Sequence, residues 1–350
     1  GEHVRVEVIE RSRDYFRAQV IEVLDAAPGR TSAPCAEVAR GCGSCQWQHI
    51  SLPTQRELKQ QVVQDSLRRL ARIDSPEVMP LIELPGSGYR TTIRAGVVNG
   101  RAGYRRRREN TLLTVEQCHI AHPLVEELLL QGEYGVADEV ILRCASRTRE
   151  RLAAPHPEGA GITVPADTRT DHLHEEVAGR RWRISARSFF QSRPDGAEAL
   201  CELVANAADE LTTGVAIDLY SGVGLFAGVL ADRGWTVVSV ESSGDAVRDA
   251  RVNLQGSEVR IVRADVAKWS PPKGHLVVAN PSRRGLGRNG LSTVVASGAS
   301  RVVLVSCDVG TFGRDTALLR SAGYGLTAVT PVDMFPHTFH VEVVSTFDRV

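Results

Sequence analysis

Lysine is nearly absent from this sequence of 350 residues, because Lys59, Lys268 and Lys273 are the only three among 42 basic residues. The formal net charge is zero, so overall charge does not by itself indicate a nucleic-acid partner. Long apolar runs are also missing, which excludes a transmembrane helix, and no signal peptide is visible. We expect a cytoplasmic, monomeric protein without membrane contact. Because the sequence opens at Gly1 directly in a strand pattern, we also expect either that it is a truncated part of a longer chain or that a disordered start precedes it.

Arginine, which supplies almost all of the positive charge, is unevenly distributed. Residues 89–120 contain seven arginines against two glutamates, and the run "YRRRREN" places four of the arginines side by side. Such a cluster near a turn could follow the phosphate backbone of a nucleic acid. It could equally be a solvated basic turn, and the sequence leaves both interpretations open.

Seven cysteines are present, an odd number in a chain without secretory features. A disulfide framework is therefore disfavoured, and a metal site or a reactive thiol is favoured. Cys35, Cys42 and Cys45 form a C-x₆-C-x₂-C arrangement, to which Cys118 can add a fourth thiolate. Four thiolates suit tetrahedral zinc or a [4Fe–4S] cluster, and spacing alone does not decide between them.

Changes of pattern along the chain predict three domains. Residues 1–30 alternate as two strands of a small β-barrel and run into the linker "APGRTSAP". Residues 31–187 hold the four candidate ligand cysteines, a helix over about 53–74 that we expect to pack on the third domain, and mostly short strands. Residues 188–350 alternate helices and strands, which predicts an α/β domain with a mostly parallel, doubly wound, Rossmann-like sheet.

A glycine loop in the third domain indicates a ligand site. In "DLYSGVGLF", Gly222 and Gly224 lie between a strand and a helix, where a backbone without side chains can approach a ligand closely. The third glycine of the dinucleotide-binding fingerprint is missing, and the signal is weak by itself.

Polar residues end five successive strands of the expected sheet, and ligands of such sheets bind beyond the carboxyl ends of the strands. These residues are Asp218, Glu241, Asp265, Asn280 and Cys307. Asp218 could hold a ligand ammonium group, Glu241 two ribose hydroxyls and Asp265 an adenine amino group. A ligand with these three groups and no demand for phosphate binding is S-adenosylmethionine, so the third domain is predicted to be a methyltransferase.

Cys307 follows the buried strand "RVVLVS", and Glu342 lies in the last strand after a proline-containing turn. A thiol and a carboxylate beside a methyl donor suit methylation of C5 of a pyrimidine. The thiolate adds to C6 and makes C5 nucleophilic, and a base later removes the C5 proton so that the thiolate can leave. Taken singly, Cys307 could be a small buried hydrophobe and Glu342 a solvated strand residue.

The motifs "FFQS", "DLYSGVGLF", "NPSRRG", "VSCDVGTFGRD" and "MFPHTFHVE" together resemble the class I RNA 5-methyluridine methyltransferases, which modify uridine in 23S rRNA or tRNA. The resemblance runs through nearly the whole chain. It implies that Cys307 is the nucleophile and Glu342 the proton-abstracting base. It also implies donor contacts from Gln191, Tyr220, Glu241, Asp265 and Asn280. The family usually has Asp-Pro-Pro-Arg where this chain has Asn280-Pro281-Ser282-Arg283.

The resemblance carries further implications for the other domains. Residues 1–30 are similar to half of a TRAM domain, an OB-like RNA-binding barrel. The run "CGSCQWQH" implies that the four cysteines hold a [4Fe–4S] cluster rather than zinc.

The expected partner is RNA, 23S rRNA before tRNA, from which the target uridine must flip out of the stack. Phe189 or Phe190 could stack on it, and Arg283 or Arg284 could hold a neighbouring phosphate. Two rival interpretations are an amino-methyltransferase, suggested by "NPSR", and a non-catalytic RNA-binding protein.

Overall fold

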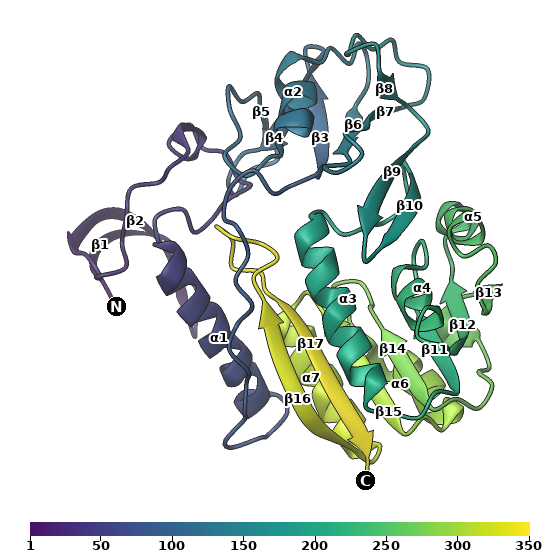
Figure 1. Cartoon of the computed structure of the whole chain (residues 1–350). Coiled ribbons are helices and arrows are strands. Elements are labelled where there is room, and N and C mark those ends of the chain that lie inside the picture. Colours follow the sequence, from purple (N-terminus) through teal and green to yellow (C-terminus); the bar gives the residue numbers. More distant parts are fainter.

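The computed structural model describes residues 1–350, arranged as a projecting hairpin, a central, mostly antiparallel sheet and a carboxyl-terminal α/β sheet (Figure 1). No helix of the chain combines the length and the apolar character that a membrane span requires. The two larger sheets lie at opposite ends of the main body, and the chain crosses between them more than once.

The α/β sheet has seven strands in the order β13-β12-β11-β14-β15-β17-β16. Neighbours from β13 through β15 are parallel, whereas β17 runs antiparallel to both β15 and β16. The predicted doubly wound sheet is therefore confirmed, with an antiparallel strand inserted near one edge. The strand bounds are β11 (Val215–Leu219), β12 (Thr236–Glu241), β13 (Val259–Arg263), β14 (Leu276–Ala279), β15 (Arg301–Ser306), β16 (Tyr324–Val332) and β17 (Glu342–Arg349).

Helices cover both faces of this sheet, because its central strands are apolar on both sides. In β15, Val303 and Val305 join one buried cluster while Val302 and Leu304 join another on the opposite face. The covering elements are α3 (Pro194–Asp209), α4 (Leu225–Ala231), α5 (Gly244–Asn253), α6 (Gly287–Ser297), α7 (Val309–Ser321) and the short 3₁₀ turn η2 (Val266–Lys268).

The central sheet has six strands in the order β5-β4-β3-β6-β7-β8, and α2 packs on it. The sequence analysis missed α2, because nine residues give little more than two turns of pattern, although Leu124, Val125, Leu128 and Leu129 do form a buried stripe at helical spacing. A 3₁₀ turn, η1 (Ala36–Val38), precedes this region beside the first cysteines. The bounds are β3 (Thr92–Val98), β4 (Arg101–Arg105), β5 (Leu112–Leu113), α2 (Pro123–Gln131), β6 (Glu139–Cys144), β7 (Arg151–His156) and β8 (Thr168–Arg169).

Two elements that precede residue 188 pack on the α/β unit. The hairpin β9 (His172–Val177) and β10 (Arg180–Ser185) shares a core with α3 and α4 through Leu173 and Trp182, although it precedes the expected domain boundary at 187/188. Helix α1 (Leu52–Arg69) places Val63 and Leu67 against Phe312 of α7. It ends at Arg69, earlier than the expected residue 74. These contacts join the two halves through buried apolar surface.

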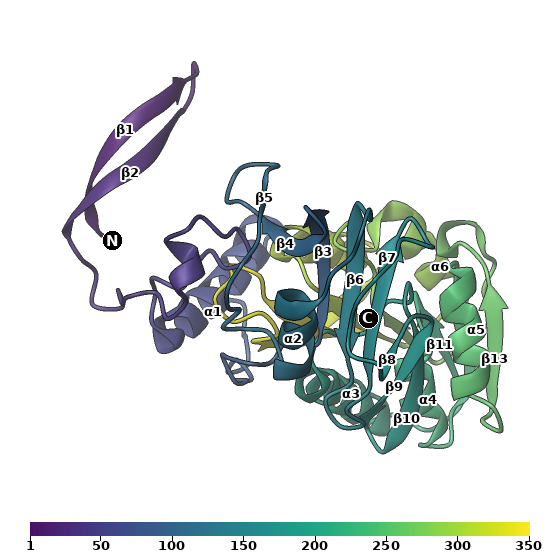
Figure 2. The same cartoon turned by 90° about the horizontal axis from the view of Figure 1, so that it is seen from above.

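The hairpin of β1 (His3–Arg11) and β2 (Phe16–Asp25) projects away from the body (Figure 2). The two predicted strands are present and pair antiparallel, but no other strand pairs with them. The OB-like barrel therefore stays a prediction.

Candidate active site

The strand order of the α/β sheet brings the predicted strand-end residues to one edge. Because β13, β12, β11, β14 and β15 are parallel neighbours, their carboxyl ends face the same side of the domain. Five residues lie at or just beyond these ends: Asp218, Glu241, Asp265, Asn280 and Cys307. The fold thus gathers on one rim side chains that are up to 89 positions apart in the chain.

The glycine loop adopts left-handed backbone conformations that suit close approach to a ligand. The φ angles are 59° at Tyr220, 56° at Gly222 and 94° at Gly224, which begins α4. The φ of 94° at Gly224 strongly favours glycine, and a Cβ atom there would also lie 2.6 Å from the end of the Leu254 side chain. Near Gly222, the closest atom to an added Cβ is the carbonyl oxygen of Phe189, at 3.8 Å. The segment that contains Gln191 therefore runs alongside the loop, and Gln191 itself is buried.

Glu241 organises this loop through both carboxylate oxygens. Its Oε2 accepts from the Gly222 amide at 3.0 Å, and its Oε1 accepts from the amides of Ser242 and Ser243 at 2.7 Å each. Oε1 also accepts from the Ser242 hydroxyl at 3.2 Å, whereas Oε2 accepts a single bond and so keeps an acceptor position for a ligand hydroxyl. The arrangement fits the predicted contact with a ribose.

Asp218 and Asp265 differ sharply in environment. Asp218 is fully buried, its Oδ2 accepts from the Ala227 amide at 2.9 Å, and its Oδ1 has no hydrogen-bond partner. Burial raises the pKa of Asp218 to about 8. Asp265 caps the short turn η2 by accepting from the Ala267 amide at 3.0 Å. An unpartnered buried carboxyl oxygen is costly, so Asp218 fits a site that a ligand donor or water completes.

Cys307 and Glu342 lie opposite each other at the end of an antiparallel strand pair. In the β15–β17 register Ser306 pairs with Val343, so the next position pairs Cys307 with Glu342. Cys307 is partly exposed and has a free thiol, whereas only 2% of Glu342 is exposed. The structure thus brings together the two residues that the sequence analysis assigned as nucleophile and base.

Burial dominates the electrostatics of this pair. It raises the pKa of Cys307 to about 11, with a further rise from Glu342, and it raises the pKa of Glu342 to about 8. The guanidinium of Arg283 lowers both pKa values, which places its positive charge near both groups. The loop that carries Arg283 is anchored by buried Asp315, which accepts from the amides of Leu286 and Gly287 at 2.6 and 2.9 Å.

The two candidate stacking rings lie in different environments. Phe189 is 66% exposed, whereas Phe190 is buried in the core against the α/β sheet. Phe190 is therefore not free to stack on a base, and Phe189 is the remaining candidate. Arg284 is exposed on the same loop as Arg283.

A groove of about 830 Å³ leads from Arg283 toward the arginine-rich turn. Its walls carry seven arginines and also aromatic side chains such as Tyr89, Trp47 and Phe339. Five of these arginines form no ion pair with a carboxylate: Arg90, Arg106, Arg107, Arg108 and Arg283. We name this surface the basic groove.

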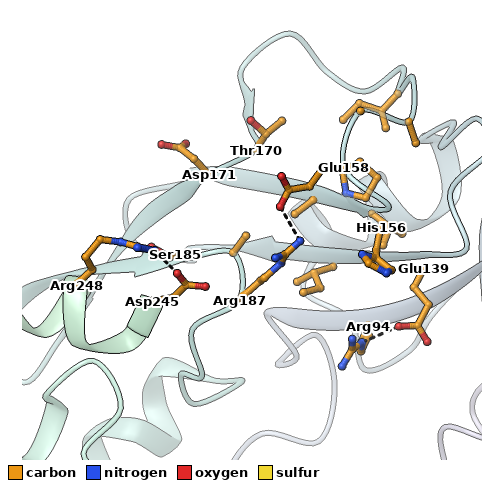
Figure 3. A pocket seen from close by; sticks show the side chains of 18 of the residues that line it. Arg94, Glu139, His156, Glu158, Thr170, Asp171, Ser185, Arg187, Asp245 and Arg248 are labelled. Carbon is orange, nitrogen blue, oxygen red and sulfur yellow. Dashed lines mark hydrogen bonds and ion pairs between the residues drawn. The ribbon is translucent and has the colours of Figure 1, made fainter. Parts of the chain in front are cut away.

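A second cleft, of about 920 Å³, has a different character (Figure 3). It lies between the central sheet, β10 and α5, and none of the strand-end candidates lines it. Its four arginines are each paired with a carboxylate, as in Arg94–Glu139 at 3.0 Å and Arg187–Glu158 at 2.6 Å. Such pairs leave little positive charge free for an anionic ligand, so the basic groove is the better candidate for nucleic acid.

The four candidate ligand cysteines are buried, carry free thiols and line one small cavity. Burial is the main cause that raises the pKa of Cys45 to about 12, and the neighbouring thiols of Cys118 and Cys42 add to it. No group of three or more His, Cys, Asp or Glu side chains is arranged to hold a single metal ion. The four thiols therefore share one cavity without forming a preformed site for a single ion.

His340 was missed by the sequence analysis. It lies two residues before Glu342 and lines the basic groove together with Arg283 and Phe339. Side chains two positions apart in extended chain share a face, and Val341 between them points into the core beneath α1. The two-residue spacing between His340 and Glu342 was therefore the sequence signal that could have pointed to His340. Burial, and then Arg283, lowers the pKa of His340 to about 4.

Known proteins are similar to this chain over almost its full length. No protein-family model matches it. An uncharacterised RNA methyltransferase of Streptomyces avermitilis is 32% identical over 99% of this chain and 90% of its own length. Another, from Streptomyces coelicolor, is 33% identical over 99% of this chain and 86% of its own length. Among solved structures, the tRNA (uracil-54, C5)-methyltransferase of Pyrococcus abyssi in complex with S-adenosyl-L-homocysteine has a TM-score of 0.78 at 21% identity, covering 99% of this chain and 93% of that one.

Proposed function

This chain belongs to the RNA methyltransferase family, and from that premise we propose that it methylates C5 of a specific uridine in RNA. S-adenosylmethionine supplies the methyl group. The observation that carries the proposal is the placement of Cys307 opposite Glu342 at the rim that also holds the glycine loop. The fold is similar to that of an enzyme whose name specifies uracil C5, which is consistent with this choice.

In the proposed reaction, each bond that forms is matched by a bond that breaks, and the acting side chains are those of Cys307 and Glu342. The sulfur of Cys307, as thiolate, forms a bond to C6 of the flipped uracil, and the electron pair of the C5–C6 double bond moves toward C5 and O4. C5 then bonds to the methyl carbon as the carbon–sulfonium bond of the donor breaks. Glu342, as carboxylate, removes the C5 proton, and the C6–sulfur bond breaks to restore the double bond and the thiolate.

Donor contacts are proposed at the rim. Glu241 would accept from the ribose hydroxyls, Asp265 from the adenine amino group and Asp218 from the ammonium group. Gln191, Tyr220 and Asn280 would complete the site, with Gly222 and Gly224 giving the backbone room. Asn280 offers one oxygen acceptor and an NH₂ donor in place of the usual carboxylate.

The basic groove is proposed to hold the RNA strand on either side of the target. Unpaired arginines interspersed with aromatic rings suit a single-stranded segment, because phosphates bind the cations and unstacked bases can stack on the rings. Phe189 would stack on the flipped base, and Arg283 or Arg284 would contact a neighbouring phosphate. A [4Fe–4S] cluster held by Cys35, Cys42, Cys45 and Cys118 would fix the wall of this groove, since Gly43 and Trp47 of the same segment line it.

The test is incubation with tritiated S-adenosylmethionine and either 23S rRNA or tRNA, followed by nucleoside mass spectrometry. Formation of 5-methyluridine in one of the two RNAs is the expected result, and the RNA that accepts the label identifies the substrate class. A methylated exocyclic amine would instead support an amino-methyltransferase. That alternative needs no cysteine nucleophile, so Cys307→Ala would then keep its activity.

A further inference from the structure

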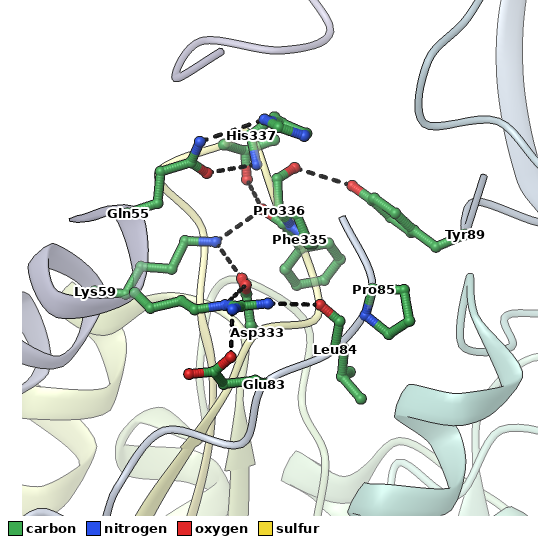
Figure 4. A network of polar contacts seen from close by, with 12 residues as sticks. Gln55, Lys59, Glu83, Leu84, Pro85, Tyr89, Asp333, Phe335, Pro336 and His337 are labelled. Carbon is green, nitrogen blue, oxygen red and sulfur yellow. Dashed lines mark hydrogen bonds and ion pairs between the residues drawn. The ribbon is translucent and has the colours of Figure 1, made fainter. Parts of the chain in front are cut away.

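Residues 333–341 connect β16 to β17 and lead directly to Glu342. This connection contributes Phe335, Thr338, Phe339 and His340 to the basic groove. Glu342 itself is placed by the pairing of β17 with β15 and β16. The connection, by contrast, is held mainly by residues from the amino-terminal third of the chain (Figure 4).

Lys59 of α1 provides the central contact. It is fully buried, and its Nζ donates to the Asp333 carboxylate at 2.7 Å and to the Phe335 carbonyl at 2.9 Å. Arg56 also contacts the Asp333 carboxylate, with its Nε 3.3 Å away. The buried carboxylate thus has a second cation nearby. The bond from Lys59 to Phe335 adds nothing to charge neutralisation, but it fixes the backbone of the connection.

Gln55, one helical turn earlier, joins the same connection to the cysteine-bearing segment. Its Oε1 accepts from the His337 amide at 2.7 Å, and its Nε2 donates to the Trp47 carbonyl at 3.0 Å. The Trp47 amide in turn donates to the His337 carbonyl at 2.9 Å. His337 has a φ of 65°, a left-handed conformation that non-glycine residues keep only where surrounding contacts enforce it.

We infer that Lys59 and Gln55 are positioning residues for methyl transfer. They hold residues 333–341 in the shape that forms the groove wall beside Cys307 and Glu342, and so they orient the target nucleotide without touching it. The inference rests on the proposed function of the groove as the RNA path. It predicts that loosening this wall slows transfer to bound RNA and leaves donor binding by the glycine loop and Glu241 unchanged.

The experiment compares Lys59→Met, Asp333→Asn and the double variant with the unaltered protein and with the exposed-lysine control Lys273→Met. Three quantities are measured: the single-turnover rate of tritium transfer to RNA, donor affinity by calorimetry, and the urea midpoint of unfolding. Lys59→Met should lower the transfer rate by about tenfold or more, because small misplacements of reacting groups are costly. Its donor affinity should stay within about twofold, and Lys273→Met should match the unaltered protein.

The double variant separates positioning from simple stability. Lys59→Met alone leaves the buried Asp333 carboxylate with only the longer contact to Arg56 and lowers the urea midpoint, whereas neutralising both Lys59 and Asp333 should restore much of it. The bond to Phe335 is still absent, so the rate should remain low. Recovery of the rate together with the midpoint would overturn the inference, as would a full rate in Lys59→Met or a parallel loss of donor affinity. Counting tritium in any RNA product keeps this test separate from the identity of the methylated atom, which only nucleoside analysis decides.

Discussion

Replacing Glu342 by glutamine should stabilise the protein and, at the same time, stop methyl transfer. Glu342 is buried, and burial raises its pKa from the usual 4.5 to about 8. Between these two values the folded protein keeps a proton that the unfolded chain has released. The contribution of the Glu342 carboxyl group to the free energy of unfolding is therefore fully present below pH 4.5 and is lost as pH rises through about 8. The difference between 4.5 and about 8 converts to about 5 kcal/mol of lost stability at pH 9.

Glutamine has nearly the same shape and cannot ionise, so Glu342→Gln should escape this loss. Its advantage over the unaltered protein should be less than about 1 kcal/mol at pH 5 and should approach the full value above pH 8. Urea unfolding at pH 5, 7 and 9 measures the trend. Asp218 titrates in the same range but is present in both proteins, so its contribution cancels. A pH-independent difference between the two proteins would refute the reasoning.

The same variant tests the assigned role of Glu342. Without a base at C5 the bond between Cys307 and C6 should persist, so RNA should remain covalently attached to the protein on denaturing gels. The exposed-residue control Glu202→Gln should change neither the pH trend nor the transfer rate. Rapid turnover by Glu342→Gln would assign the base to another group.

Three further outcomes follow from the site. Cys307→Ala should abolish both transfer and the covalent RNA adduct while donor affinity by calorimetry stays within about twofold, and an adduct in this variant would exclude Cys307 as nucleophile. Arg107→Ala should weaken binding of all RNA sequences similarly and reduce the slope of log affinity against log salt by about one, whereas Arg260→Ala, outside the groove, should leave a filter-binding series unchanged. Cys118→Ala should lower the iron and acid-labile sulfide content per chain, and Cys201→Ala, buried in the helix-covered core, should not.

The strands of the α/β sheet were predictable because burial on both faces gives them nearly continuous apolar sequences. "RVVLVS" illustrates this, since all six residues of β15 are buried. The packing of hairpin β9–β10 was not predictable, because its alternating pattern fits any half-buried sheet equally well. Only the tertiary structure shows that Trp182 packs into the core beside α4, with its ring within reach of Gly228. The helical pattern of α1 was clear, but its end depends on the left-handed turn at Arg72, which no local signal announces.

The strand-end residues were predictable from the sequence for a topological reason: parallel strands present their carboxyl ends at one edge, so residues at those positions must meet. The network of Lys59 and Asp333 has no such rule behind it, since the two residues are 274 positions apart and neither lies in a recognisable motif spacing. The choice between Phe189 and Phe190 likewise depended on which ring the fold buries.

The charge state of the proposed catalytic pair follows from where the fold places it. A thiolate and a carboxylate that face each other at a buried strand end would repel, and each would lose its hydration. With pKa values near 11 and 8, both groups are mostly protonated in the ligand-free protein at neutral pH, so the site avoids two buried negative charges. The positive charge of Arg283 lowers the pKa of both groups, so each of them ionises more readily than it would without this arginine. A second positive charge bound at the rim would lower them further. The proposed nucleophile, Cys307, would therefore stay a thiol until ligands complete the site, which would limit reactions of an exposed thiolate with other molecules.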